Sequence, residues 1–222
     1  MEKYAIIVAG GSGIRMGGNI PKQFQLLKGK PVLWYSVKAF TDAYADVQII
    51  LVIPAIYMAR AESVSKEFPG RKINITTGGE TRFHSVKNGL KLVSENSIVF
   101  VHDGVRCLVT PRLIQQCHDA AIEKGNAVPA VASTDTIRFE TSTGNVQVDR
   151  NKVKIIQTPQ TFYSSDLAAA FASEYDLSFT DEAGVIEKTG IRINLVEGET
   201  TNIKITKPVD LLIAEKILDE RR

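Results

Sequence analysis

Short apolar runs rich in Val and Ile alternate with amphipathic segments along most of the chain, and this alternation constrains the fold most strongly. The runs are apolar nearly throughout, as strands that are covered on both faces must be. They predict strands at residues 4–8, 47–53, 73–77, 98–102, 127–132 and 193–197. Helical periodicity predicts helices at residues 32–40, 56–68, 85–93, 113–124 and 209–222. Strands that alternate with helices indicate an α/β fold with a mostly parallel sheet flanked by helices.

Composition narrows the class of protein. The chain has 222 residues, 44% of them hydrophobic, which favours one α/β domain over residues 1–222. Its 27 basic and 25 acidic residues leave a net charge of +2, so bulk charge does not indicate a nucleic-acid-binding protein. No apolar run approaches the roughly 20 residues of a membrane-spanning helix. We therefore expect neither a nucleic acid nor a membrane as partner.

The cysteines and histidines indicate no metal site. Cys107 and Cys117 provide no disulfide framework, and their spacing matches no zinc motif. The three histidines do not supply the missing ligands and are interpreted as ordinary surface or core residues. A reducing cytoplasmic compartment is the expected location, because the chain opens on a short apolar run rather than a secretory signal.

One stretch, residues 133–157, interrupts the alternation of strands and helices. Polar and apolar residues alternate on either side of a turn at residues 143–145, a pattern typical of a β-hairpin. The hairpin has too few apolar residues for a core of its own, so we expect it to project from the domain as an inserted β-arm. It either packs on a second subunit or is a simple surface hairpin.

A glycine-rich loop, residues 9–18, follows the first predicted strand directly. Glycines at the carboxyl end of a strand let backbone amides approach an anionic ligand. The loop lacks the G-x-G-x-x-G spacing of dinucleotide-binding proteins, because Ile14, Arg15 and Met16 follow Gly13. The chain also lacks the Walker string G-x-x-x-x-G-K-[ST]. The loop is thus a phosphate-binding candidate of a third kind.

Two cations distinguish this loop. Arg15 lies inside it, and Lys22 follows seven residues later. Negative charge builds up around the α-phosphorus when a phosphate attacks a nucleoside triphosphate, and fixed cations lower that barrier. Arg15 can offer a planar fork and Lys22 a compact point charge. The pattern favours nucleotidyl transfer over a glycine-rich turn with solvated basic residues.

The loop and later motifs resemble the cytidylyltransferases that activate sugar-alcohol phosphates, most closely those acting on 2-C-methyl-D-erythritol 4-phosphate. The matching motifs lie at residues 78–82, 85–90, 101–106, 148–150, 157–160, 180–182 and 202–206, so they cover nearly the whole chain in order. The resemblance implies a Rossmann-like sheet of the nucleotidyltransferase type with a protruding β-hairpin arm. It also implies transfer of a cytidylyl group from CTP to 2-C-methyl-D-erythritol 4-phosphate, with release of pyrophosphate, in non-mevalonate isoprenoid precursor synthesis.

The resemblance also implies roles for individual residues. The catalytic residues would be Arg15, Lys22 and Lys204. The nucleotide-binding residues would be Ala9, Gly10, Gly11, Gly13, Gly79, Glu80, Ser85 and Asp103. The acceptor-binding residues would be Arg106, Arg150, Thr158 and Thr180. Mg²⁺ would be bound mainly through the CTP phosphates, with no dedicated metal residue, and the arm would join two subunits in a homodimer.

Several alternatives stay open. Gly10 stands where the methylerythritol enzymes frequently have alanine, and a double glycine also occurs in ribitol-phosphate relatives, so ribitol-5-phosphate cytidylyltransferase is the main alternative. A hexose-1-phosphate nucleotidylyltransferase and an inactive nucleotide-binding module are the others. Asp103 and Arg106 could form a purely structural ion pair. Cys107 replaces a proline that is usual in the family, and its thiol, beside a cationic site, could have a lowered pKa.

Overall fold

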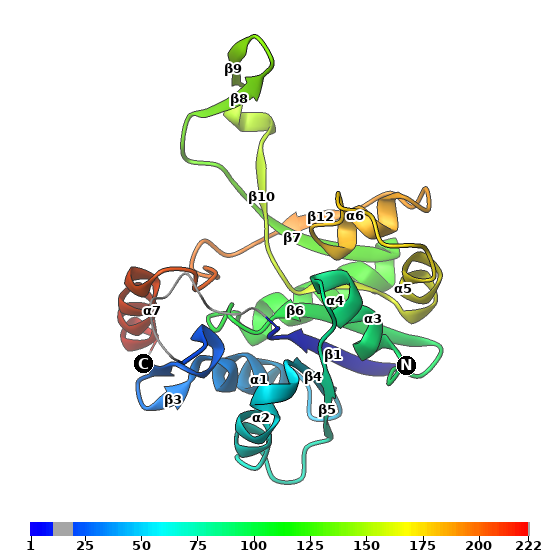
Figure 1. Cartoon of the computed structure of the whole chain (residues 1–222), viewed down its shortest axis with the longest axis vertical. Helices are drawn as coiled ribbons and strands as arrows, with labels where there is room; N and C mark the ends of the chain where they lie inside the picture. The colour runs from blue at the N-terminus through cyan, green and yellow to red at the C-terminus, as the bar shows by residue number, and fades with distance from the viewer. Residues whose placement is uncertain (11–19, 222) are drawn as a thin grey trace.

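An eight-stranded sheet runs through the middle of the molecule, with helices on both faces (Figure 1). The computed structural model describes residues 1–10 and 20–221. The strand order is β10-β7-β11-β6-β1-β4-β5, and β12 also pairs with β7. The strands are β1 (Glu2–Val8), β4 (Gln48–Ile53), β5 (Ile73–Thr77), β6 (Ser97–Asp103), β7 (Asn126–Ala132), β10 (Lys154–Ile156), β11 (Gln160–Tyr163) and β12 (Leu195–Glu197).

The predicted mostly parallel sheet is confirmed. The pairs β1–β4, β1–β6, β4–β5 and β7–β12 are parallel. Two short strands run the other way: β11 is antiparallel to both β6 and β7, and β10 is antiparallel to β7. The sequence did not predict β10 or β11, because each is only three or four residues long and neither shows a clear apolar period.

Two hydrophobic cores lie on opposite faces of the sheet. One core packs against α1 (Val32–Ala43), α2 (Met58–Ser65) and α4 (Pro111–Lys124), and the other against α3 (Arg82–Leu90), α5 (Ser164–Phe171) and α6 (Glu182–Glu187). Successive residues of β1 alternate between them, since Ile7 belongs to the first core and Ile6 to the second. Cover on both faces explains why the central strands are continuous apolar runs.

Helix boundaries follow local capping chemistry. Thr110 accepts a hydrogen bond from the Leu113 amide at the start of α4, and Gly125, with φ of 91°, ends that helix. The predicted helix at 85–93 instead begins at Arg82, because Thr81 caps it. The helix predicted at 56–68 is a 3₁₀ turn, Ala55–Tyr57, followed by the shorter α2. The sequence did not predict α5 and α6.

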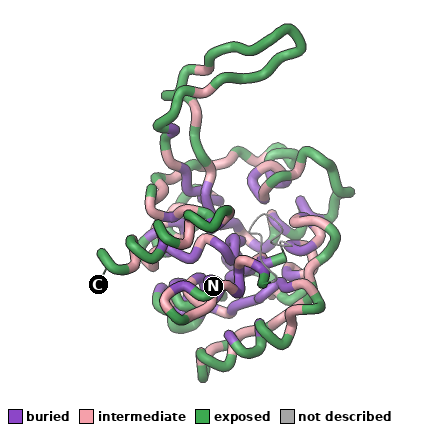
Figure 2. The backbone as a smooth tube through the Cα atoms, turned by 60° about the vertical axis from the view of Figure 1, so that its left-hand side comes forward, coloured by how far each residue is buried: buried purple, intermediate pink, exposed green. Residues whose placement is uncertain are grey.

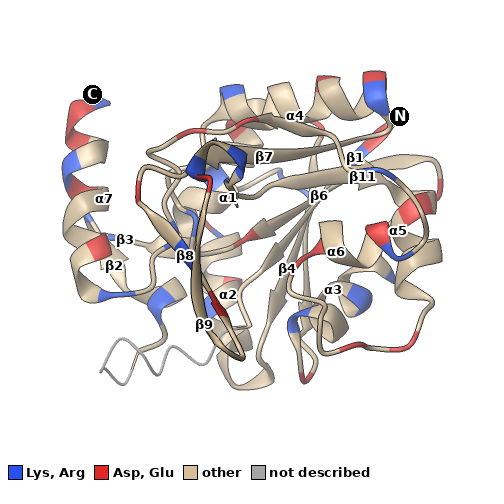
Figure 3. Cartoon of the chain, turned by 90° about the horizontal axis from the view of Figure 1, so that it is seen from above, with Lys and Arg blue, Asp and Glu red and all other residues tan. Residues whose placement is uncertain are grey.

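The remaining elements surround the sheet. The last helix, α7, spans Pro208–Glu220. A small ladder joins β2 (Leu26–Leu27) to β3 (Lys30–Pro31) beside it. Acidic and basic side chains are interspersed on α4 and α7 (Figure 3), in keeping with the small net charge. Within residues 1–10 and 20–221, no helix has the length and apolar character needed to cross a membrane.

The hairpin predicted within residues 133–157 is present and projects from the domain (Figures 1 and 2). Its strands are β8 (Ile137–Thr141) and β9 (Gly144–Val148). Phe139 pairs with Val146 on one side of the hairpin, and these residues are 65% and 53% exposed. The arm therefore presents an uncovered apolar face in a single chain.

Gly89 of α3 sets how closely this helix approaches the sheet. A Cβ at this position would lie 2.8 Å from Ile6 Cγ2 and 3.2 Å from Val52 Cγ2. We expect Gly89→Ala to lower the free energy of unfolding by about 1–3 kcal/mol through overpacking, measured by urea denaturation. Gly184→Ala in α6 is the control, because its Cβ would meet only Asp181 Oδ1 at 3.4 Å. A Gly89→Ala variant as stable as the Gly184→Ala variant would contradict the close packing.

Candidate active site

A hollow of about 330 Å³ lies at the carboxyl ends of the central strands. Eight of the residues predicted to bind or catalyse line it: Ala9, Gly10, Lys22, Gly79, Glu80, Ser85, Asp103 and Lys204. They come from segments far apart in the sequence, and the structure brings them together. Three other predicted residues, Gly11, Gly13 and Arg15, lie outside the described residues.

Parallel pairing brings the ends of the strands to one level. Val8, the last residue of β1, is in register with Asp103, the last residue of β6. The amide of Gly104 donates to the Val8 carbonyl at 2.9 Å, and the Ala9 amide donates to Val52 O at 2.9 Å. The buried Gln23 side chain donates from Nε2 to the Ala9 carbonyl at 2.7 Å. The segment carrying Lys22 is thereby fixed to the end of β1.

A tight turn, residues 78–81, forms one wall of the hollow. The Gly79 amide donates to Ser85 Oγ at 3.1 Å, and the Ser85 hydroxyl donates to the Thr81 carbonyl at 2.9 Å. Glycine is required at position 79, because a Cβ there would lie 2.4 Å from His84 Cβ. The turn therefore folds back on the first turn of α3, and Ser85 is the side chain that holds it.

The carboxylate of Asp103 is the centre of charge in the hollow. Lys204 Nζ lies 2.9 Å from Oδ2, Arg82 Nη2 lies 3.1 Å from Oδ1, and Arg106 Nε lies 3.5 Å from Oδ2. Burial alone would raise the pKa of Asp103, but these three cations hold it well below its usual range. Asp103 is therefore ionised at neutral pH, and its pair with Arg106 is one part of a larger cluster.

Arg82 joins this cluster to α6, and the sequence analysis did not select it. Its guanidinium contacts Asp103 and also Glu182, whose side chain is 1% exposed. Burial raises the pKa of Glu182, and the neighbouring Arg82 opposes that shift. A cation in the first turn of a helix is unfavourable unless carboxylates face it. An arginine directly after a helix cap such as Thr81 therefore indicates that carboxylates lie nearby. This sequence signal would have identified Arg82.

Two predicted acceptor-binding residues, Arg106 and Thr158, lie behind Asp103 and have internal partners. The Arg106 guanidinium donates to the carbonyls of Asn202 at 2.8 Å and Ile156 at 3.2 Å. The Thr158 hydroxyl oxygen accepts from the Asp103 amide at 3.1 Å. Both side chains thus stabilise the floor of the hollow.

The other two predicted acceptor-binding residues do not line this hollow. Arg150 is exposed in a 3₁₀ turn, Arg150–Lys152, at the base of the arm, where it donates to the Thr134 carbonyl at 3.3 Å. Thr180 precedes α6, and its neighbour Asp181 caps that helix by accepting from the Gly184 amide at 3.0 Å. Any part these residues have in an acceptor site comes from outside the hollow.

The thiol of Cys107 differs from the sequence-based expectation. Its side chain is buried with hydrophobic neighbours, and burial raises the pKa of the thiol to about 12. Burial therefore excludes the lowered pKa that the sequence left open for this thiol. Cys107 is a protonated core residue at neutral pH.

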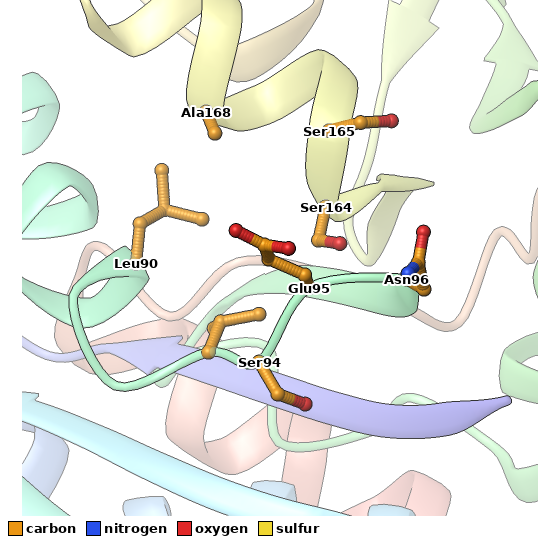
Figure 4. Close-up of a pocket in the computed structure, with 8 residues that line it drawn as sticks. Leu90, Ser94, Glu95, Asn96, Ser164, Ser165 and Ala168 are labelled. Carbon is orange, nitrogen blue, oxygen red and sulfur yellow. The ribbon is translucent and has the colours of Figure 1, made fainter.

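A second hollow, of about 260 Å³, lies at the opposite end of β6 (Figure 4). It is lined by Leu90, Val93, Ser94, Glu95, Asn96, Ser164, Ser165 and Ala168. None of these residues is basic, whereas the first hollow gathers Lys22, Arg82 and Lys204. The positive charge of the first hollow therefore suits an anionic substrate, whereas the second hollow offers none.

The Arg82–Glu182 contact gives a stability prediction. We expect Glu182→Gln to lower the free energy of unfolding at neutral pH by about 2 kcal/mol. This is less than the roughly 3–5 kcal/mol typical of a broken buried pair, because Arg82 keeps Asp103 as a partner. Glu187→Gln, an exposed change on the same helix, is the control and should change little. Equal denaturation midpoints for the two variants would contradict a stabilising pair.

Comparison with known proteins agrees with this geometry. Residues 4–220 match the family model described as 2-C-methyl-D-erythritol 4-phosphate cytidylyltransferase. The enzyme of that name from Phocaeicola vulgatus is 44% identical over 219 residues, which cover 98% of this chain and 100% of the relative. The one from Bacteroides thetaiotaomicron is 43% identical over 220 residues, again covering 98% and 100%.

Solved structures show the same fold. The 4-diphosphocytidyl-2C-methyl-D-erythritol synthase of Anaerococcus prevotii superposes with a TM-score of 0.85 at 28% identity, covering 98% of each chain. The 2-C-methyl-D-erythritol 4-phosphate cytidylyltransferase of Thermus thermophilus gives a TM-score of 0.78 at 29% identity, covering 99% of this chain and 100% of the other. The chain therefore belongs to the 2-C-methyl-D-erythritol 4-phosphate cytidylyltransferase family.

Proposed function

We propose that this chain transfers the cytidylyl group of CTP to 2-C-methyl-D-erythritol 4-phosphate, in non-mevalonate isoprenoid precursor synthesis. The products are 4-diphosphocytidyl-2-C-methyl-D-erythritol and pyrophosphate. One observation carries the proposal: in a member of this family, Lys22 and Lys204 line one hollow at the carboxyl ends of the strands, beside an ionised Asp103. Two buried cysteines without a disulfide support a reducing compartment, the cytoplasm.

The reaction needs no nucleophilic side chain. An oxygen of the acceptor phosphate forms a bond to the α-phosphorus of CTP, and the bond to the bridging oxygen breaks as pyrophosphate leaves with the electron pair. Catalysis is then positioning and charge stabilisation. Lys22 and Lys204, together with Arg15 from outside the described residues, would hold the charge that develops around the α-phosphate. Asp103 keeps Lys204 Nζ directed into the hollow.

The nucleotide would occupy the side of the hollow near β1 and the 78–81 turn. Backbone amides of Ala9 and Gly10, with Gly11 and Gly13 from outside the described residues, would bind the phosphates. Gly79, Glu80 and Ser85 would read the edge of the cytosine, and their turn is fixed by the Gly79–Ser85 hydrogen bond. A fixed turn supports discrimination, because the wrong base would leave buried polar groups unpaired. Asp103 would complete the nucleotide site from the floor.

Mg²⁺ is proposed as the divalent cation, bound mainly through the CTP phosphates. Among the described residues, no three His, Cys, Asp or Glu side chains form a metal-binding group. Among the described residues that line the hollow, only Glu80 and Asp103 offer carboxylates, and Asp103 is already paired with three cations. This sparse set fits Mg²⁺, which commonly keeps water and substrate phosphates as ligands. When bound, the ion would neutralise charge on the triphosphate.

The acceptor would enter beside Arg106, Thr158 and Thr180. Arg150 lies on the arm, outside the hollow of its own chain. We propose that two chains form a homodimer through their arms and that Arg150 serves the acceptor site of the other subunit. The uncovered apolar face of the arm supports this proposal, because exposed apolar patches on projecting elements are typical of interfaces.

The arm gives a prediction about assembly. Ile137, Phe139, Val146 and Val148 share one face of the hairpin, and Gln147 lies on the other. We expect the wild-type chain to scatter light as a dimer at micromolar concentration and Phe139→Asp to scatter as a monomer with reduced turnover. Gln147→Asp is the matched control and should remain dimeric. A monomeric wild-type chain would contradict the assembly.

The proposed function is tested by measuring pyrophosphate release from CTP and Mg²⁺ with three acceptors in parallel. Turnover with 2-C-methyl-D-erythritol 4-phosphate supports the proposal. Turnover only with ribitol 5-phosphate would favour the alternative acceptor that Gly10 suggested. A preference for UTP or dTTP with a hexose 1-phosphate would indicate the third class, and CTP binding without any release would indicate an inactive binding module.

The chemical step should need both Lys22 and Lys204, the two proposed catalytic residues that the structure describes. We expect Lys204→Ala and Lys22→Ala each to lower kcat by about 10²-fold or more, the scale for losing one preorganised charge partner. Lys216→Ala is the control, because that side chain is 73% exposed on α7. Near-normal turnover of either variant would remove that lysine from the catalytic role.

A further inference from the structure

A fully buried histidine lies directly behind the proposed nucleotide site. His102 precedes Asp103 in β6, and its ring packs against Phe40 edge to face, with centroids 5.3 Å apart. Its two ring nitrogens have different partners. Nε2 lies 3.2 Å from the Arg106 carbonyl oxygen, and Nδ1 lies 3.0 Å from Thr158 Oγ1. Both partners belong to segments that the proposed function uses.

These partners determine where the imidazole proton lies. A carbonyl oxygen can only accept a hydrogen bond, so Nε2 carries the proton and donates to Arg106. Burial lowers the pKa of His102 to about 3, so the ring is neutral at physiological pH and holds one proton. Nδ1 is therefore an acceptor, and the Thr158 hydroxyl donates to it.

The proton of the Thr158 hydroxyl is consequently used in the hydrogen bond to His102 Nδ1. The same oxygen accepts from the Asp103 amide at 3.1 Å, and the residue is 4% exposed. A hydroxyl has one proton and two lone pairs, so a single lone pair is left. Thr158 can accept from a hydroxyl of a sugar alcohol, but it has no proton to give to a phosphate.

We propose that His102 is a positioning residue of the transfer reaction, which fixes the turn from Asp103 to Arg106 through its Nε2 proton and through Thr158. The inference rests on the proposed function for its kinetic part. His102 donates directly to the Arg106 carbonyl. It also accepts from the Thr158 hydroxyl, whose oxygen in turn accepts from the Asp103 amide. The Arg106 amide closes the turn on the Asp103 carbonyl at 2.9 Å. The pair thus anchors both ends of the turn that directs the Asp103 carboxylate at Lys204.

The proton position is tested without any substrate. Heteronuclear NMR of the imidazole nitrogens in the isotope-labelled full chain should show His102 protonated at Nε2 and unprotonated at Nδ1 throughout the neutral range. The chain has three histidines, and loss of the signal in His102→Asn assigns it. A proton on Nδ1 would overturn the proposal whether or not the protein turns over CTP.

Kinetics separates positioning from direct binding of the acceptor. We expect Thr158→Val to lower kcat by about 10-fold, in line with loss of a buried hydrogen bond, and Thr158→Ser to restore it. His102→Asn, which keeps an acceptor near Nδ1, should retain more turnover than His102→Leu. The double variant His102→Leu/Thr158→Val should be no slower than the slower single variant, because the two residues act as one unit.

Thr161→Val is the matched control, because Thr161 is also buried and pairs with Phe100 and Ala127 in the sheet. It should fold and turn over as the wild type does. If Thr158 instead donated to the acceptor phosphate, Thr158→Val would raise only the acceptor KM and His102→Leu would have no effect on kcat. That outcome would overturn the proposal while leaving the proposed function intact.

Discussion

Three cations converge on the carboxylate of Asp103, two of them from distant parts of the chain, at a depth where burial alone would raise the pKa of that group. Arg82 comes from the start of α3, Arg106 from the turn after β6, and Lys204 from the segment before α7. A buried charge is tolerated only when it is paired and hydrogen-bonded. The contacts that make the hollow cationic are therefore the contacts that hold its walls together.

The sequence was sufficient to predict the central strands, because burial on both faces requires continuous apolar runs that are easily recognised. The run that formed β6 was predicted at 98–102, and the strand is one residue longer at each end. Its last residue is Asp103, a charged group that no hydrophobicity argument assigns to a buried strand. The helices α5 and α6 were not predicted, since they are only eight and six residues long and their boundaries depend on tertiary contacts such as Gln160 with Asp181.

The family resemblance selected most of the candidate site, and the geometry of a parallel sheet explains why those residues meet. Parallel strands bring their carboxyl ends to one edge of the sheet, so motifs that follow β1, β5 and β6 converge there. Lys22 was selected by its charge chemistry and by the resemblance, and Lys204 by the resemblance alone; the structure places both in the hollow. Arg82 was missed because its importance comes from its pairing with Glu182, exactly one hundred residues along the chain. Such a pairing has no local sequence pattern.

The antiparallel direction of β11 determines which segment of the chain lies next to Asp103. Because β11 is antiparallel to β6, its first residue, Gln160, lies opposite Val101 near the carboxyl end of β6. The chain entering β11 therefore passes the end of β6, which brings Thr158 to the Asp103 amide and to His102. A parallel strand in the same place would have presented its exit segment there instead. The missed strand is thus the element that lets a buried histidine act on the floor of the site.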